Sequence, residues 1–140
     1  MTIGLACNKQ TPLEQAVAIM IAPVVGPEVI SGSTRLKAGT AQKMVLNMLS
    51  TGTMILLGKT FGNLMVDVQA TNSKLRRRAI TIVQQATGLD ALAAEALLEA
   101  SDGEVKTAIL VGRAGLEPER AREQLAQHGN ILRVALDALS

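Results

Sequence analysis

The sequence predicts a mixed α/β fold in which most residues are helical. Two short apolar segments, residues 2–7 and 17–23, are typical of parallel strands that are covered on both faces. A long apolar stretch within residues 35–57 has the length of a helix. Beyond residue 88 the chain is rich in alanine and is divided by regularly spaced glycines, which is typical of a small helical bundle.

The first 23 residues predict a strand–helix–strand unit. "TIGLAC" and "VAIMIAP" are the strands, and the segment between them carries a cap at Thr11, proline at position 12 and Glu14 three residues after the cap. A pair of parallel strands leaves both edges open and at least one face bare. We therefore expect the rest of the sheet to come from residues upstream of Met1 or from another chain.

The next element is a helix from about Arg35 to Leu57, capped by Ser33 or Thr34 and ended by a glycine. Polar residues interrupt its apolar run "MVLNMLSTGTMILLG" well before the about 18 continuous apolar residues of a membrane span, so we expect a buried core helix and no membrane partner. Because the run is apolar nearly all round, we expect a homo-oligomer that associates through residues 35–75. Residues 59–72 predict an irregular crossing segment.

The remaining elements are helices. Asn72 or Ser73 can cap a helix that Gly88 ends. Four shorter helical pieces follow within residues 90–139, with Asp102 and Glu117 as candidate caps. The change to short, alanine-rich segments predicts a domain boundary near residue 88, which gives domains 1–87 and 88–140.

Composition excludes several classes of function. Phe61 is the only aromatic residue, so the chain has no surface on which bases could stack. The net charge of +2 is too small to indicate a polyanion partner, and "KLRRR" at 74–78 is interpreted as a solvated helix face. We therefore expect no nucleic-acid partner. Cys7 and His128 are the only residues of their kinds, so we expect no disulfide framework and no metal site, in a reducing cytoplasm.

The strongest local motif lies at the start of the long helix. Ser31, Ser33 and Thr34 offer hydroxyl groups beside free helix amides, and Arg35 and Lys37 add positive charge. Such a helix start favours a bound anion. The alternative is an ordinary helix cap with a solvated first turn.

Glu28 precedes this helix start closely. Next to a sugar phosphate its carboxylate would suit a general base or an acceptor for hydroxyl groups. The alternative is a surface carboxylate paired with Arg35 or Lys37. The glycine pattern of a nucleotide-binding loop is absent, and we expect no cofactor.

Three segments together resemble a known family. "TIGLACN", "PVVGPEVISGSTRLKAGTAQKMVLNMLSTG" and "GNLMVDVQATNSKL" are similar to the N-acetylmuramic acid 6-phosphate etherases, which belong to the sugar isomerase (SIS) superfamily. The glucokinase regulatory proteins have a similar "GPE…GS(S/T)R(L/M)K" segment. Residues 88–140 are similar to the small ubiquitin-associated-like bundle that ends these etherases.

The resemblance implies a cytoplasmic homodimeric lyase with a five-stranded parallel sheet. Such an enzyme cleaves the D-lactyl ether of N-acetylmuramic acid 6-phosphate to N-acetylglucosamine 6-phosphate and D-lactate during recycling of cell-wall sugars. Elimination and then hydration are carried out by two glutamates that act as base and acid.

This chain resembles only the C-terminal half of such an enzyme: the last two strands of the sheet, the "GPE" segment, the long helix and the bundle. The resemblance places the two catalytic glutamates and the phosphate loop before Met1, so the chain alone is expected to be inactive. Glu28 aligns with a glutamate that is a base in the isomerase domain of glucosamine-6-phosphate synthase. In etherases the residue looks more like a ligand contact. Together with Ser31, Ser33, Thr34 and Lys37, Glu28 is therefore expected to bind substrate.

Three readings of function remain open at this point. The chain is part of an etherase, or it is a non-catalytic regulatory module that binds a sugar phosphate, or it is a protein-interaction domain whose working surface is the helical bundle.

Overall fold

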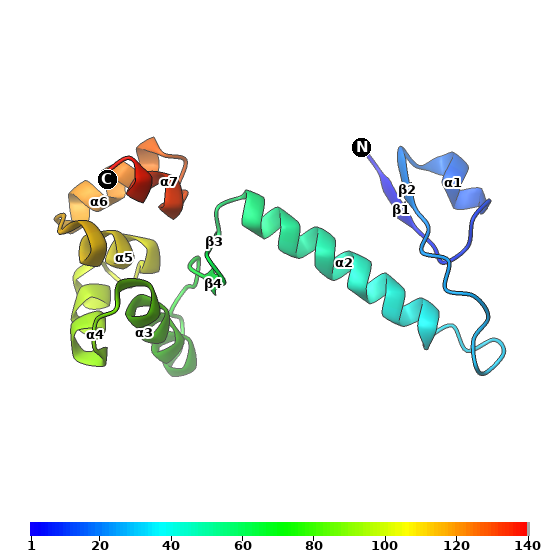
Figure 1. Cartoon of the computed structure of the whole chain (residues 1–140), viewed down its shortest axis with the longest axis horizontal. Coiled ribbons are helices and arrows are strands. Elements are labelled where there is room, and N and C mark those ends of the chain that lie inside the picture. The colour runs from blue at the N-terminus through cyan, green and yellow to red at the C-terminus, as the bar shows by residue number, and fades with distance from the viewer. Residues whose placement is uncertain (140) are drawn as a thin grey trace. The chain divides into compact units, whose positions relative to one another are not determined.

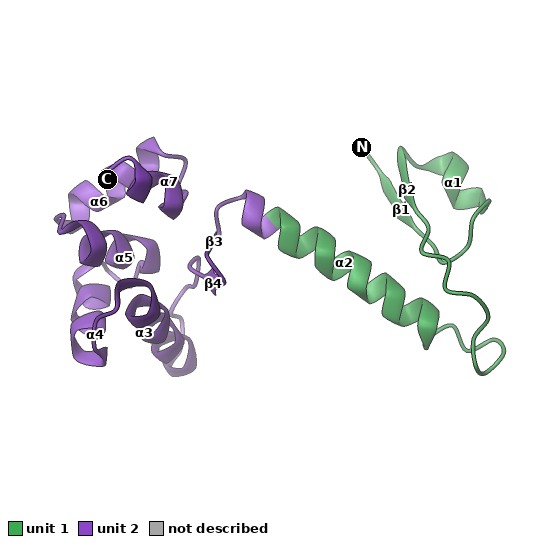
Figure 2. Cartoon of the chain, in the orientation of Figure 1, with its two compact units in different colours: residues 1–53 green, residues 54–140 purple. Residues whose placement is uncertain are grey.

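A computed structural model describes residues 1–139 of the chain. It is mostly helical with a small parallel pair of strands, which confirms the predicted fold class in its coarse form (Figure 1). The chain divides into two compact units, Met1–Thr53 and Met54–Ser140 (Figure 2). Membership of a larger SIS-type sheet and the ubiquitin-associated-like character of the bundle stay predictions.

The first unit begins with the predicted strand–helix–strand arrangement. Strands β1 (Ile3–Leu5) and β2 (Ile19–Ile21) pair in parallel, and α1 (Pro12–Ala16) connects them. Proline occupies the start of α1 as expected.

The predicted cap of α1 differs in its partners. The Thr11 side chain makes no capping hydrogen bond, and the Glu14 carboxylate instead accepts a hydrogen bond from the Gln10 amide at 2.9 Å. The carboxylate therefore reaches one residue further back than a capping box requires.

The long helix α2 (Lys37–Leu56) begins at Lys37 rather than at Arg35. The prediction that it is a buried core helix is wrong for this chain by itself, because none of its residues is buried. Met48, for example, is 62% exposed. The physical reason is that the first unit contains only a two-stranded sheet and one short helix, which are too small to cover several faces of a long helix.

After the last residues of α2, the second unit continues with a hairpin where an irregular segment was expected. Strands β3 (Thr60–Phe61) and β4 (Leu64–Met65) pair antiparallel, and the Val66 amide extends their ladder with a hydrogen bond to the Lys59 carbonyl at 3.0 Å. Two-residue strands are too short to produce a detectable alternation of apolar residues, so the sequence pattern could not reveal them.

Five helices complete the second unit: α3 (Ser73–Thr87), α4 (Ala91–Ala100), α5 (Val105–Ala114), α6 (Pro118–Gln127) and α7 (Leu132–Asp137). The buried hydrophobic residues of the described chain all lie in this unit, between Val66 and Ala135. The largest fully buried apolar side chains are Ile109, Leu110, Leu132, Val66, Val83 and Val105.

Capping of these helices agrees with the sequence in part. The Asn72 side chain accepts a hydrogen bond from the Leu75 amide, and Gly88 ends α3, both as predicted. Asp102 does not cap α5, because that helix begins only after Glu104. Glu117 occupies the N-cap position of α6, as predicted, but its side chain makes no capping hydrogen bond.

The compact units do not divide at residue 88. Helix α3 packs against α4 and α5 and shares their core through Ala79, Ile82 and Val83. The division into domains 1–87 and 88–140 rests on the change in sequence composition near residue 88 and on the resemblance, and it stays a prediction.

Among residues 1–139, no helix combines the length and the apolar character that crossing a bilayer would require.

Candidate functional site

Glu28 holds the first turn of α2. Its Oε2 accepts a hydrogen bond from the Lys37 amide and its Oε1 accepts one from the Ala38 amide, each at 2.9 Å. These amides are two of the donors that a helix start leaves unpaired. The anion at this helix start is therefore a carboxylate of the chain itself.

The two hydrogen bonds also lower the pKa of Glu28. The Ala38 amide has the largest effect and the Lys37 amide the next; slight desolvation opposes them, and the charge of Lys37 adds to the lowering. Glu28 is consequently ionised at neutral pH. A carboxylate in this state is a good acceptor for hydroxyl groups and a weak base.

The predicted hydroxyl groups lie in the turn that leads into α2. Ser31 and Thr34 are exposed and Ser33 is half-buried. Within residues 1–139, the side-chain oxygens of these three residues have no hydrogen-bond partner. The prediction that Ser33 or Thr34 caps the helix with its side chain is wrong, because Glu28 takes that place.

Arg35 and Lys37 are exposed at the same helix start. In the described part of the chain neither side chain is in an ion pair. Glu28 forms no ion pair with either cation: its hydrogen bond to Lys37 comes from the backbone amide, and the charge of the Lys37 ammonium group contributes only the smallest of the effects that act on the pKa of Glu28. Both cations thus remain available to a ligand.

Cys7 links the segment that follows β1 to the start of α2. Its thiol donates a hydrogen bond to the Ala38 carbonyl at 3.4 Å, and the side chain is half-buried. The helix start therefore lies beyond the carboxyl end of a parallel strand, where open α/β sheets bind their ligands. This link spans 31 positions, so no local pattern in the sequence could have revealed it.

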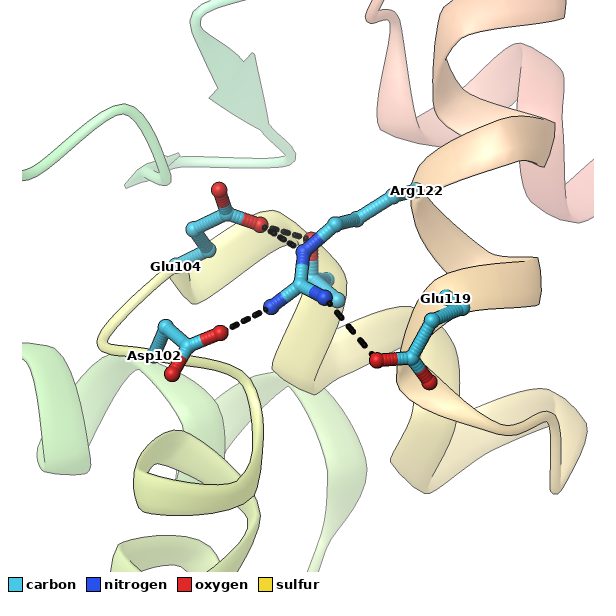
Figure 3. A network of polar contacts seen from close by, with 5 residues as sticks. Asp102, Glu104, Glu119 and Arg122 are labelled. Atoms are coloured by element: carbon cyan, nitrogen blue, oxygen red, sulfur yellow. Dashed lines mark hydrogen bonds and ion pairs between the residues drawn. The ribbon is translucent and has the colours of Figure 1, made fainter.

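A second group of charges lies in the helical bundle (Figure 3). The Arg122 guanidinium contacts Asp102 at 2.6 Å, Glu104 at 2.9 Å and Glu119 at 3.5 Å. Partial burial opposes ionisation of Glu104, but hydrogen bonds from Thr107 and Arg122 outweigh it and lower the pKa of Glu104. This network holds α6 against the start of α5. We interpret its role as structural.

No group of three or more His, Cys, Asp and Glu residues is placed to hold a metal ion among residues 1–139. The His128 Nδ1 lies 2.8 Å from the Gln124 carbonyl near the end of α6.

Comparison with known proteins confirms the resemblance drawn from the sequence. The N-acetylmuramic acid 6-phosphate etherase of Vibrio vulnificus (strain YJ016) is 55% identical over 136 residues, which is 97% of this chain and 45% of that protein. The etherases of Salmonella paratyphi B and Pectobacterium atrosepticum are 54% and 56% identical over 97% and 96% of the chain. Residues 62–106 match the family model for the C-terminal lid domain of glucokinase regulatory protein.

The chain spans about half the length of these relatives. Of the five predicted site residues, the structure gathers Glu28 and Lys37 at one helix start through a hydrogen bond, and Ser31, Ser33 and Thr34 lie in the turn between them.

Proposed function

We propose that this chain supplies one wall of a sugar-phosphate site in a cytoplasmic carbon–oxygen lyase. The chain is similar to the N-acetylmuramic acid 6-phosphate etherases over nearly its whole length. The reaction is cleavage of the D-lactyl ether of N-acetylmuramic acid 6-phosphate, which yields N-acetylglucosamine 6-phosphate and D-lactate. Identity of 54–56% to the relatives carries this proposal.

In this proposal Glu28 orients the sugar rather than moving a proton. Each of its oxygens already accepts one backbone hydrogen bond, and each retains a lone pair for a sugar hydroxyl group. Its lowered pKa supports this role, because a carboxylate that is stabilised in the ionised form is a poor general base at neutral pH.

Ser31, Ser33, Thr34 and Lys37 form the side of the site that faces the phosphate group. Unpaired hydroxyl groups and an unpaired ammonium group are suitable partners for phosphate oxygens. Each such contact at an exposed helix start contributes about 0.3–1 kcal/mol and is weakened by salt. We therefore expect millimolar affinity for a hexosamine 6-phosphate.

An NMR titration with N-acetylglucosamine 6-phosphate at low salt tests this site. We expect the amide resonances of residues 28–37 to shift, and the shifts to weaken in Lys37→Gln. The matched control is Lys43→Gln, which removes the same charge from an exposed position of the same helix outside the proposed site and leaves the shifts unchanged. Shifts confined to the bundle, with residues 28–37 unmoved, would refute the assignment and leave an ordinary helix cap.

Catalysis in this proposal needs groups that the resemblance places outside the 140 residues. Loss of one general acid or base costs about 10²–10⁴-fold in rate. We expect no release of D-lactate by the chain alone, and release when it is combined with a polypeptide that contains the unmatched part of the Vibrio vulnificus etherase. D-lactate formed by the chain alone, above a boiled control, would contradict the first expectation.

The match of residues 62–106 to the lid domain of glucokinase regulatory protein favours a second candidate, a non-catalytic module that binds a sugar phosphate or a partner protein. The two candidates differ in one result. A regulatory module would bind N-acetylglucosamine 6-phosphate but would release no D-lactate in the combined experiment.

A further inference from the structure

The first turn of α2 has no amide left for a ligand. The Lys37 and Ala38 amides donate to the two oxygens of Glu28, each at 2.9 Å. The next two amides, those of residues 39 and 40, donate to carbonyls of the preceding turn at 2.9 Å and 3.0 Å. A helix start ordinarily leaves such donors unpaired, and they then bind phosphate or sulfate ions. Here the chain's own groups take all four.

The Glu28 carboxylate occupies this place as a free oxyanion would. Each of its two oxygens accepts a hydrogen bond from one amide of the helix start. Because the carboxylate is part of the same chain, it competes at a high effective concentration. Its negative charge also repels a second anion at the same amides. Inorganic phosphate therefore has to displace a tethered competitor of its own charge sign.

The turn beside the helix start is open by contrast. A Cβ atom built at Gly32 would meet no atom within 4 Å, so there is room for a ligand next to Ser31 and Ser33. The side chains of Arg35 and Lys37 are exposed, and within residues 1–139 neither is in an ion pair. The site thus consists of two parts, an amide pair that a carboxylate closes and a cationic turn that remains accessible.

We propose that Glu28 determines the specificity of this site, because it excludes free anions from the start of α2 and reserves that place for hydroxyl groups of a ligand. The phosphate group of a sugar phosphate then binds to side chains of residues 31–37, and the sugar hydroxyl groups meet the carboxylate. The exclusion of free anions does not depend on the etherase reaction, whereas the orientation of the sugar rests on the proposed function.

Sulfate is the first probe, titrated into the ¹⁵N-labelled full chain at constant ionic strength. In Glu28→Ala we expect the Lys37 and Ala38 amides to shift with saturation, and to bind sulfate about tenfold more tightly than in the native chain. The matched control is Glu14→Gln. This variant removes another carboxylate of the first unit that accepts a backbone hydrogen bond, and it should behave like the native chain. Equal sulfate affinity in the native chain and Glu28→Ala would overturn the proposal.

Acetate gives a measurement that does not require a fully formed helix start in the variant. Glu28→Ala lacks the atoms that acetate supplies, so acetate should restore the native resonances of the Lys37 and Ala38 amides and should compete with sulfate. If the first turn frays in the variant, either anion should return it to the helical state. Amides that respond to neither anion would overturn the proposal.

A comparison of two phosphates tests specificity directly. The ratio of the affinity for N-acetylglucosamine 6-phosphate to that for inorganic phosphate should fall about tenfold in Glu28→Gln, because inorganic phosphate gains access and the sugar loses a charged acceptor. An unchanged ratio would contradict the specificity role. A native chain that fails to bind the sugar phosphate, while sulfate still distinguishes it from Glu28→Ala, would refute the proposed function and support the exclusion of anions.

Discussion

At the scale of single residues, the start of α2 depends on the Glu28 carboxylate, which lies nine positions before the Lys37 amide that donates a hydrogen bond to it. The hydrogen bonds from the Ala38 and Lys37 amides lower the pKa of Glu28 from its ordinary value. A group whose pKa falls on folding stabilises the folded state fully above its unfolded pKa. That contribution is lost as pH falls through the lower, folded pKa.

We therefore expect an acid titration to loosen this helix start. The amide resonances of Lys37 and Ala38 should move on acidification, with a midpoint below the ordinary pKa of a glutamate, because protonation removes the charged acceptor. The variant Glu28→Gln, which cannot titrate, should lack this transition. A midpoint in the native chain at or above the ordinary pKa of a glutamate would show that the carboxylate does not hold the helix start in solution.

Two buried hydroxyl groups in the bundle offer a second comparison. Ser101 is fully buried and its Oγ has no hydrogen-bond partner, whereas the buried Thr107 hydroxyl donates to Glu104 at 2.8 Å. An unpaired buried polar group costs free energy, and a paired one stabilises the fold.

Ser101→Ala should therefore be neutral or raise the free energy of unfolding by up to about 1 kcal/mol, and Thr107→Val should lower it by about 1 kcal/mol. Urea unfolding of both variants measures the difference. Losses of the same size in both would mean that the Ser101 hydroxyl has a partner in solution.

At the scale of elements, the end of α2 is fixed by packing against the loop before α7. Gly58 has a φ of +65°, and a Cβ atom built there would lie 2.6 Å from the Ile131 Cγ1. Gly129 has a nearly identical φ of +64°, but no atom lies within 4 Å of its would-be Cβ. The two glycines thus share a backbone conformation and differ in their surroundings.

Both alanine variants carry the left-handed backbone cost of about 1–2 kcal/mol. Only Gly58→Ala also displaces Ile131, so it should reduce the free energy of unfolding by about 1–3 kcal/mol more than Gly129→Ala does. Thermal unfolding followed by circular dichroism measures both. Equal losses would show that the contact between Gly58 and Ile131 is loose.

The elements that could be predicted are those whose determinants are local. A proline at the start of α1, the Asn72 side chain at the start of α3 and Gly88 at its end act within a few positions along the chain. Residues 90–139 follow the same rule, because their helices are short and separated by glycines. Two contacts could not be predicted because they depend on distant partners: Glu28 binds the amides of α2, and Cys7 binds Ala38. The β3–β4 hairpin is local, but its two-residue strands are too short to show an alternating pattern.

The candidate site follows the same division. Its residue types and their order were visible in the sequence, and so was the choice of a helix start. That the chain's own carboxylate occupies the free amides was not visible, because capping rules look about three positions ahead and this contact spans ten.

At the scale of the whole molecule, the two units differ in what holds them together. The buried hydrophobic side chains of the described chain belong to residues 66–135, and the first unit has none. Burial of apolar surface is the main favourable term in folding. The second unit should consequently fold without the first.

A fragment of residues 54–140 should unfold cooperatively, with a midpoint temperature within a few degrees of that of the second unit in the full chain. A fragment of residues 1–53 should show no cooperative transition. Circular dichroism against temperature distinguishes them. A residue 54–140 fragment without a transition would mean that the bundle depends on contacts with the first unit.

The apolar surface of α2 leads to a prediction about association. Met44 and Met48 lie four positions apart on one helix face and are 58% and 62% exposed, and Leu46 is 57% exposed on another. Exposed apolar surface of this extent on one element marks an interaction site in a folded protein. We predict that a second copy of the chain covers this surface, through residues 35–75.

We therefore expect light scattering at micromolar concentration to give a mass greater than that of one chain. Replacing both Met44 and Met48 by glutamine should shift the mass toward one chain, because it makes this face polar. Leu92→Gln is the matched control, since Leu92 is 81% exposed but lies on α4 outside residues 35–75. A native mass equal to one chain would refute the prediction. Loss of association in the Leu92 variant, with association of the Met44 and Met48 variant unchanged, would place the contact on the bundle instead of on α2.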